Sequence, residues 1–87
     1  MDTAELIEKE EVINYKLVDA APNQNITKEK LERALRLGNE YKSKTVITFQ
    51  THQGPKKIET TVWTLTENHI QIKSSVSIPI KSLIDIS

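Results

Sequence analysis

Two histidines are the side chains best suited to acid–base chemistry or metal binding near neutral pH. His52 and His69 each lie beside polar residues at the end of a predicted strand, and neither has a close histidine companion. The chain contains no cysteine, and the spacing of its residues shows no metal-ligand pattern. We therefore expect surface histidines at turns, and we predict no enzyme activity, cofactor or metal ion.

A basic binding surface is the second candidate site. It would consist of three lysines and one histidine from the second half of the chain: Lys57, His69, Lys73 and Lys81. Such lysines could neutralise phosphates of a nucleic acid. Strand lysines also keep sheet edges solvated and unpaired, and this second role is favoured. Basic and aromatic residues are too sparsely interleaved here for a typical single-strand binder.

A helix is predicted for about 27–41, ahead of the strands that carry these residues. Thr27 is a suitable N-cap, and Ile26 is placed to pack on Leu31 across the first turn. An apolar stripe with helical spacing follows: Leu31, Ala34, Leu35 and Gly38. Gly38 either ends the helix or lets it lie close to a sheet, and we favour an end between residues 37 and 41.

Five short strands are predicted after the helix, because apolar and polar residues alternate between tight polar turns. The strands are 45–51, 58–65, 70–72, 76–80 and 83–86. A turn centred on Gly54-Pro55 pairs Thr51 with Ile58. This register collects four apolar residues on one face: Ile47, Phe49, Ile58 and Val62.

The opposite face of the same long strand is also apolar. A turn at Glu67-Asn68 pairs Leu65 with Ile70 and Trp63 with Ile72. We therefore predict Trp63 in the core, with a stacking platform for a base or a partner side chain as the alternative. A flat sheet would expose one apolar face, so the strand must bend or both faces must be covered.

Two details concern the later strands. The Ser74-Ser75 turn is predicted to be longer than two residues, which aligns Ile78 with Ile72. Pro79 has no N–H donor and is expected at a sheet edge or break. The predicted fold class is α+β, with the helix packed on a curled five-stranded antiparallel meander or small barrel of the SH3-like or Sm-like kind.

The charge is unevenly distributed over the 87 residues, although the net charge is zero. Residues 1–25 hold six acidic residues against two lysines, a net of −4, and the remainder carries +4. Two arrangements follow for 1–25: an acidic arm docked on a basic face, or a partly disordered solvated tail. Residues 26–87 would form the single helix-plus-β domain.

The absence of cysteine suits a reducing compartment, so we expect a cytoplasmic location. The longest apolar run is two or three residues, too short for a membrane span. The acidic first segment is also unlike a secretory signal.

The predicted order of elements is similar to that of Sm-like RNA-binding proteins and, more loosely, of SH3-like barrels. The resemblance covers residues 27–87. The family's aspartate-containing turn before its third strand corresponds to Glu67-Asn68-His69, and its final turn to Ile80-Lys81-Ser82. Thr60-Thr61 stands where the family usually has a glycine in its bent second strand. The resemblance implies a small RNA-binding barrel.

The segment 62–72, followed by 78–86, also looks like small bacterial proteins of unknown function and like bacterial PH-type sheets. The favoured function is a non-enzymatic module that binds a protein partner or a second copy of itself. The reason is that the two-faced apolar strand 62–65, together with Val46 and 83–86, leaves more apolar surface than one short helix can cover. Sm-like RNA binding through the four basic-surface residues is the alternative, and a PH-type lipid or peptide site along an open strand at 76–80 is a weaker one.

Overall fold

The computed structural model describes residues 4–20, 26–73 and 76–86. Within these ranges, one α-helix, two 3₁₀ helices (η) and seven short strands form an α+β fold, which confirms the predicted class. In chain order these are β1 (Glu5–Leu6), η1 (Lys9–Asn14), α1 (Lys28–Tyr41), β2 (Thr45–Thr51), β3 (Gly54–Thr60), β4 (Val62–Leu65), β5 (His69–Ile72), β6 (Val76–Pro79), η2 (Ile80–Ser82) and β7 (Leu83–Ile86).

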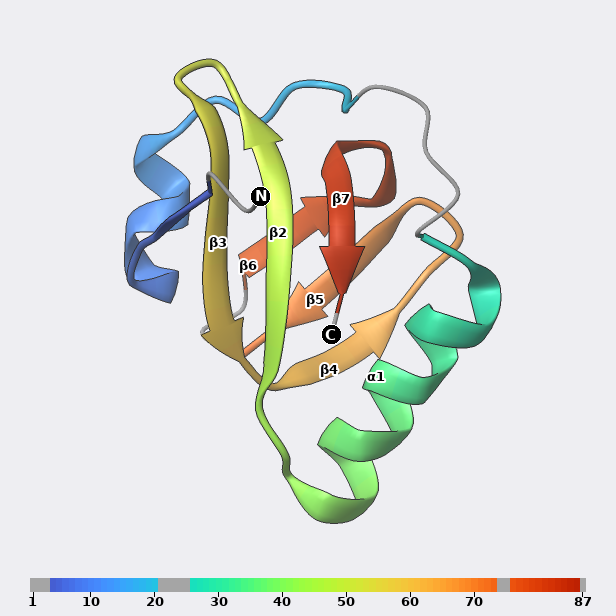
Figure 1. Ribbon diagram of the computed structural model, residues 1–87. Coiled ribbons are helices and arrows are strands. Elements are labelled where there is room, and N and C mark those ends of the chain that lie inside the picture. Colours follow the sequence, from blue (N-terminus) through green and yellow to red (C-terminus); the bar gives the residue numbers. More distant parts are fainter. Residues whose placement is uncertain (1–3, 21–25, 74–75, 87) are drawn as a thin grey trace.

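The strands form two sheets around one core (Figure 1). One sheet has the order β1-β3-β2-β7 and the other β4-β5-β6, and over the described residues they do not close into a barrel. The prediction of a five-stranded meander is only partly matched. The chain passes from one sheet to the other at Thr61, and β7 returns to pair with β2 instead of continuing beside β6.

The start of α1 follows from its first residues. The Thr27 hydroxyl accepts a hydrogen bond from the Lys30 N–H at 3.1 Å, which confirms the predicted N-cap. The helix ends at Tyr41, where Lys42 adopts a left-handed conformation with φ 52° and its N–H donates to the Gly38 carbonyl. The end at Tyr41 lies within the favoured range of 37–41, but Gly38 is inside the helix and does not itself end it.

Removing the N-cap tests this helix start. Thr27→Ala is expected to lower the free energy of unfolding by about 1 kcal/mol, because the Lys30 N–H loses its acceptor. Urea denaturation followed by circular dichroism measures the change. Thr27→Ser keeps an acceptor hydroxyl and should remain within a few tenths of wild type, so equal losses in both variants would contradict this role.

Gly38 has a packing role instead. A Cβ atom built on Gly38 would overlap the carbonyl oxygen of Val62 and lie 3.1 Å from Thr61 Cγ2. The helix backbone therefore rests directly on the backbone at the start of β4, as the position of α1 beside β4 in Figure 1 indicates.

The β2–β3 hairpin turns at His52-Gln53, so the predicted turn centred on Gly54-Pro55 is wrong. Thr51 pairs with Gly54, and its Oγ1 accepts from the Gln53 N–H at 3.1 Å and donates to the Gly54 carbonyl at 2.7 Å. Gly54 has φ 103°, a conformation that suits glycine. The register differs from the prediction by an even number of residues, so the same side chains point inward, and Ile47, Phe49 and Ile58 are each 0% exposed.

Trp63 is 46% exposed, so the prediction that it lies in the core is wrong. Leu65 pairs with Ile70 as expected, but Val62 pairs with Ile72, so β4 contains one extra residue between these pairs. This bulge turns Val62 and Leu65 to the same side of the sheet and leaves Trp63 outside. The single core thus receives apolar residues that the sequence pattern assigned to opposite faces.

The β5–β6 connection spans three residues between the paired Ile72 and Val76, longer than two residues as predicted. Ser74 and Ser75 themselves lie outside the described residues. Ile78 aligns with Ile70, not with Ile72 as predicted. Pro79 lies opposite His69 on β6, an edge strand of its sheet, which confirms its expected position.

The described part of the acidic segment lies against the four-stranded sheet. β1 pairs in parallel with β3, and the side chains of Ile7 and Val12 are buried in the core. The Glu5 carboxylate forms a 3.1 Å ion pair with Lys56, one of the basic residues of β3. This part of the segment is therefore held against β3 and the core by backbone pairing, buried side chains and an ion pair.

Candidate binding groove

Two turns on neighbouring strands, at 67–69 and 79–81, meet at one end of the three-stranded sheet. The Ile80 N–H donates to the Asn68 carbonyl at 2.8 Å, and His69 lies opposite Pro79. Together they form a hollow of about 530 Å³ lined by Glu67, Asn68, His69, Pro79, Ile80 and Lys81. Two of the predicted site residues, His69 and Lys81, are therefore brought together.

Hydrogen bonds fix the backbone on both sides of this hollow. Thr66 Oγ1 accepts from the His69 N–H at 3.0 Å, and the Thr66 N–H donates to the His69 carbonyl at 2.9 Å. The Lys81 carbonyl accepts from the Ala20 N–H at 2.8 Å. The side chains of His69 and Lys81 remain exposed. A ligand would meet movable polar side chains on a fixed backbone.

The other two predicted site residues lie elsewhere. Lys57 is on β3 opposite Thr48, in the four-stranded sheet, where its carbonyl accepts from the Ile7 N–H at 2.9 Å. Lys73 follows the far end of β5, about 13 Å along the strand from His69 at about 3.3 Å per residue. The four residues therefore do not form the single basic surface that the sequence predicted.

An apolar hollow adjoins the polar one. It has a volume of about 600 Å³ and is lined by Ile26, Thr27, Lys28, Leu31, Leu65, Thr66, Glu67 and Ile80. Glu67 and Ile80 line both hollows, so the two lie next to each other. We name the combined surface the turn groove. The apolar half was not predicted from the sequence, because Ile26, Leu65 and Ile80 meet only in the folded chain, where each is partly buried against the core.

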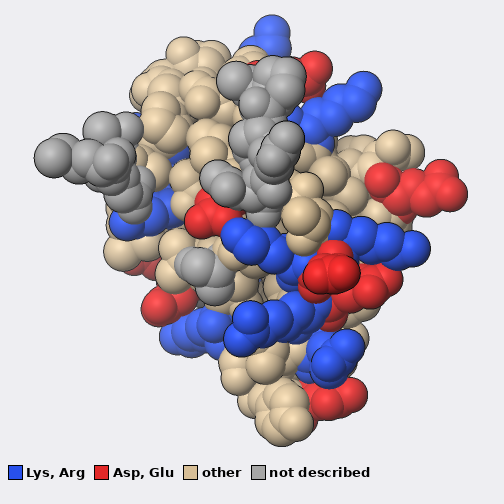
Figure 2. All heavy atoms as spheres, turned by 45° about the vertical axis from the view of Figure 1, so that its right-hand side comes forward, with Lys and Arg blue, Asp and Glu red and all other residues tan. Residues whose placement is uncertain are grey.

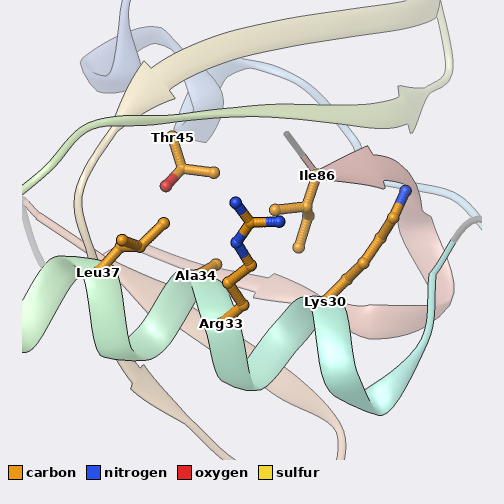
Figure 3. Close-up of a pocket in the computed structure, with 6 residues that line it drawn as sticks. All are labelled: Lys30, Arg33, Ala34, Leu37, Thr45 and Ile86. Carbon is orange, nitrogen blue, oxygen red and sulfur yellow. The ribbon is translucent and has the colours of Figure 1, made fainter.

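A smaller cavity lies between α1 and the edge of the four-stranded sheet. This helix–sheet pocket measures about 340 Å³ and is lined by Lys30, Arg33, Ala34, Leu37, Thr45 and Ile86 (Figure 3). Ala34, Leu37 and Ile86 give it apolar walls, whereas Lys30 and Arg33 are exposed basic residues on the helix. It is separate from the turn groove, with which it shares no lining residue.

The second histidine has a structural contact. His52 Nδ1 accepts from the Lys16 N–H at 3.1 Å and so ties the docked segment to the β2–β3 turn. Among residues 4–20, 26–73 and 76–86, no group of three His, Asp or Glu side chains is placed to hold a metal ion. The one α-helix in this part of the chain is too short and too polar to cross a membrane.

No family model, curated protein or solved structure matched the chain in our comparisons.

Proposed function

We propose that this chain is a small non-enzymatic module that binds a protein partner through the turn groove. The supporting observation is the junction of the two hollows, where apolar side chains adjoin His69 and Lys81. Protein-binding surfaces commonly combine an apolar centre with a polar rim.

The chemistry of the groove suggests what the partner presents. An apolar side chain would contact Leu31, Leu65 and Ile80 in the larger hollow. A carboxylate close to it in the same segment would then lie near the ammonium group of Lys81. The proposed ligand is therefore an extended segment with a large apolar residue followed closely by an acidic one.

Peptide selection followed by charge reversal tests this proposal. A displayed peptide library selected on the full chain should yield peptides of that type, and amide shifts in NMR spectra should map them to 65–69 and 79–81. Lys81→Glu should weaken their binding about tenfold, which corresponds to about 1.4 kcal/mol. Lys73→Glu makes the same charge change outside the groove and should leave the affinity unchanged. Equal effects of both variants, or shifts elsewhere, would refute the proposal.

A second copy of the chain is one possible protein partner. Val62 is only 1% exposed, so self-association can no longer be motivated by that residue. In the described part of the chain, four large apolar side chains are exposed instead: Leu6, Ile13, Tyr41 and Trp63. Sedimentation velocity at micromolar concentration distinguishes a dimer from a monomer that requires a different partner.

RNA binding is the second candidate function, favoured by one specific observation. The two turns that correspond to turns of Sm-like proteins both line the polar hollow, at Asn68-His69 and Ile80-Lys81, and this brings together two of the four candidate RNA-binding residues, His69 and Lys81. Adding the protein should then slow the migration of short U-rich or A-rich RNA in electrophoresis, and this shift should become smaller as the salt concentration rises. A missing shift at low ionic strength would exclude this function without affecting the peptide proposal.

A further inference from the structure

The helix–sheet pocket contains a buried hydroxyl without a partner. Thr45 is 3% exposed, and its Oγ1 forms no hydrogen bond with any described residue. A buried hydroxyl is nearly always hydrogen-bonded, because leaving it unpaired costs free energy. Figure 3 shows this oxygen on the side of Thr45 that faces α1, across the pocket from Ala34 and Leu37. The hydroxyl therefore has an unused donor just beneath the pocket surface, where a ligand reaches it once a neighbouring side chain moves aside.

The same pocket has an available cation. Lys30 is paired with Asp85 at 3.1 Å, so the charges of these two side chains largely cancel. Arg33 has no ion pair with a described residue, and Figure 3 shows its guanidinium extending from the helix toward Thr45 and Ile86. Basic and acidic side chains are interleaved over the face of the molecule seen in Figure 2. Arg33 supplies the local excess of positive charge at this pocket.

A donor and a cation suit an anionic group on a ligand, and the pocket walls indicate what else that ligand contains. Ala34, Leu37 and Ile86 present apolar surface, which inorganic phosphate would leave uncovered. A neutral apolar molecule would cover the walls but leave both Arg33 and the Thr45 hydroxyl unpaired. The ligand that satisfies all the groups has an anionic head with oxygen acceptors and a short apolar body.

We infer that the helix–sheet pocket binds a small organic acid whose carboxylate contacts Arg33 and Thr45 and whose apolar body lies against Ala34, Leu37 and Ile86. Arg33 is exposed and has a long, movable side chain, so it can swing aside as the carboxylate enters and then pair with it. The Thr45 hydroxyl donates its proton to one carboxylate oxygen. This site involves none of the residues of the turn groove, so it stands independently of the proposed function.

Hexanoate is the probe that tests the inference, in a titration of the full chain followed by amide shifts in NMR spectra. The shifts should concentrate at Ala34, Leu37, Thr45 and Ile86, with a dissociation constant on the order of 1 mM for so small a ligand. Acetate retains the charge without the apolar body, and hexan-1-ol retains the body without the charge. Both should bind at least tenfold more weakly than hexanoate.

A matched pair of threonine variants separates ligand binding from fold stability. Thr60 lies directly opposite Thr45 in the β2–β3 pairing, is 2% exposed, and also has an unpartnered hydroxyl. It does not line the helix–sheet pocket. Thr45→Val and Thr60→Val should both raise the melting temperature of the free protein, because each removes an unpaired buried hydroxyl. Of these two variants, only Thr45→Val should weaken hexanoate binding, by about tenfold. Arg33→Gln should weaken it by a similar factor.

Three results would overturn the inference. Hexan-1-ol binding as tightly as hexanoate would show a purely apolar cavity. Equal losses of hexanoate affinity in Thr45→Val and Thr60→Val would show that the hydroxyls act through the strand pair and not on the ligand. Shifts confined to 65–69 and 79–81 would place the acid in the turn groove.

Discussion

Gly38→Ala is expected to lower the free energy of unfolding by about 3 kcal/mol, although alanine is the better helix former. Helix propensity alone would favour the substitution by about 1 kcal/mol. The opposing term is steric, because the new methyl group would overlap the Val62 carbonyl and crowd Thr61 Cγ2 at 3.1 Å. Both neighbours belong to the chain segment that crosses between the sheets, so relief requires α1 to move away from β4.

Asn39→Ala is the matched control for this prediction. Asn39 is the next residue of the helix and is exposed, so only the propensity gain of about 0.5 kcal/mol should appear. Guanidinium denaturation of both variants followed by circular dichroism measures the two free energies. If Gly38→Ala is as stable as Asn39→Ala, the helix does not rest on the backbone of β4.

Local signals were sufficient to predict the helix but not to assign the role of Gly38. Thr27 acts as an N-cap through the Lys30 N–H, three residues away, so its role is contained in the local sequence. Gly38 faces Val62, which is 24 positions later in the chain. Its proximity depends on how two sheets pack, and residue types near Gly38 carry no information on that distance. A glycine followed by asparagine therefore indicated a helix end.

Strand faces were predicted better than strand partners. The even shift of the β2–β3 register kept Ile47, Phe49 and Ile58 on the inner face. Trp63 was misplaced because the pairing was extrapolated along β4 without a bulge. A bulge changes which residues share a face. Here it allows both Val62 and Leu65 to pack into the one core. The bulge therefore depends on how the two sheets pack together, and the local sequence of β4 does not contain that information.

The candidate site was predicted in part for the same reason. His69 and Lys81 belong to turns on neighbouring strands, and the order of elements was enough to bring them together. Lys57 was assigned to the same surface, but β3 belongs to the other sheet, and Lys73 lies at the opposite end of β5 from His69. The apolar half of the turn groove combines residues 26–31 with residues 65–67 and 80, so no local sequence pattern predicts it.

Phe49→Ala is expected to lower the free energy of unfolding by about 4 kcal/mol. Phe49 is 0% exposed at the centre of β2, which has β3 on one side and β7 on the other. Truncation removes a large apolar surface and leaves a cavity between well-fixed strands that cannot readily collapse. Small domains have only about 5–15 kcal/mol of stability, so this loss takes a large part of it. Phe49→Leu fills most of the space and should cost only about 1 kcal/mol, which keeps the experiment interpretable if the alanine variant does not fold.

Trp63→Ala is the decisive comparison, because it truncates a larger aromatic side chain than Phe49→Ala does. If Trp63 filled the core as the unbroken strand pattern predicted, its loss would cost as much as that of Phe49. With 46% of the residue exposed beside the bulge, the expected cost is about 1 kcal/mol. Urea denaturation of the two variants gives both free energies, and a cost for Trp63→Ala equal to that for Phe49→Ala would mean that β4 pairs without the bulge. A small cost, with unchanged circular dichroism, identifies Trp63 as a surface aromatic residue that folding does not require and that remains available for contact with a partner.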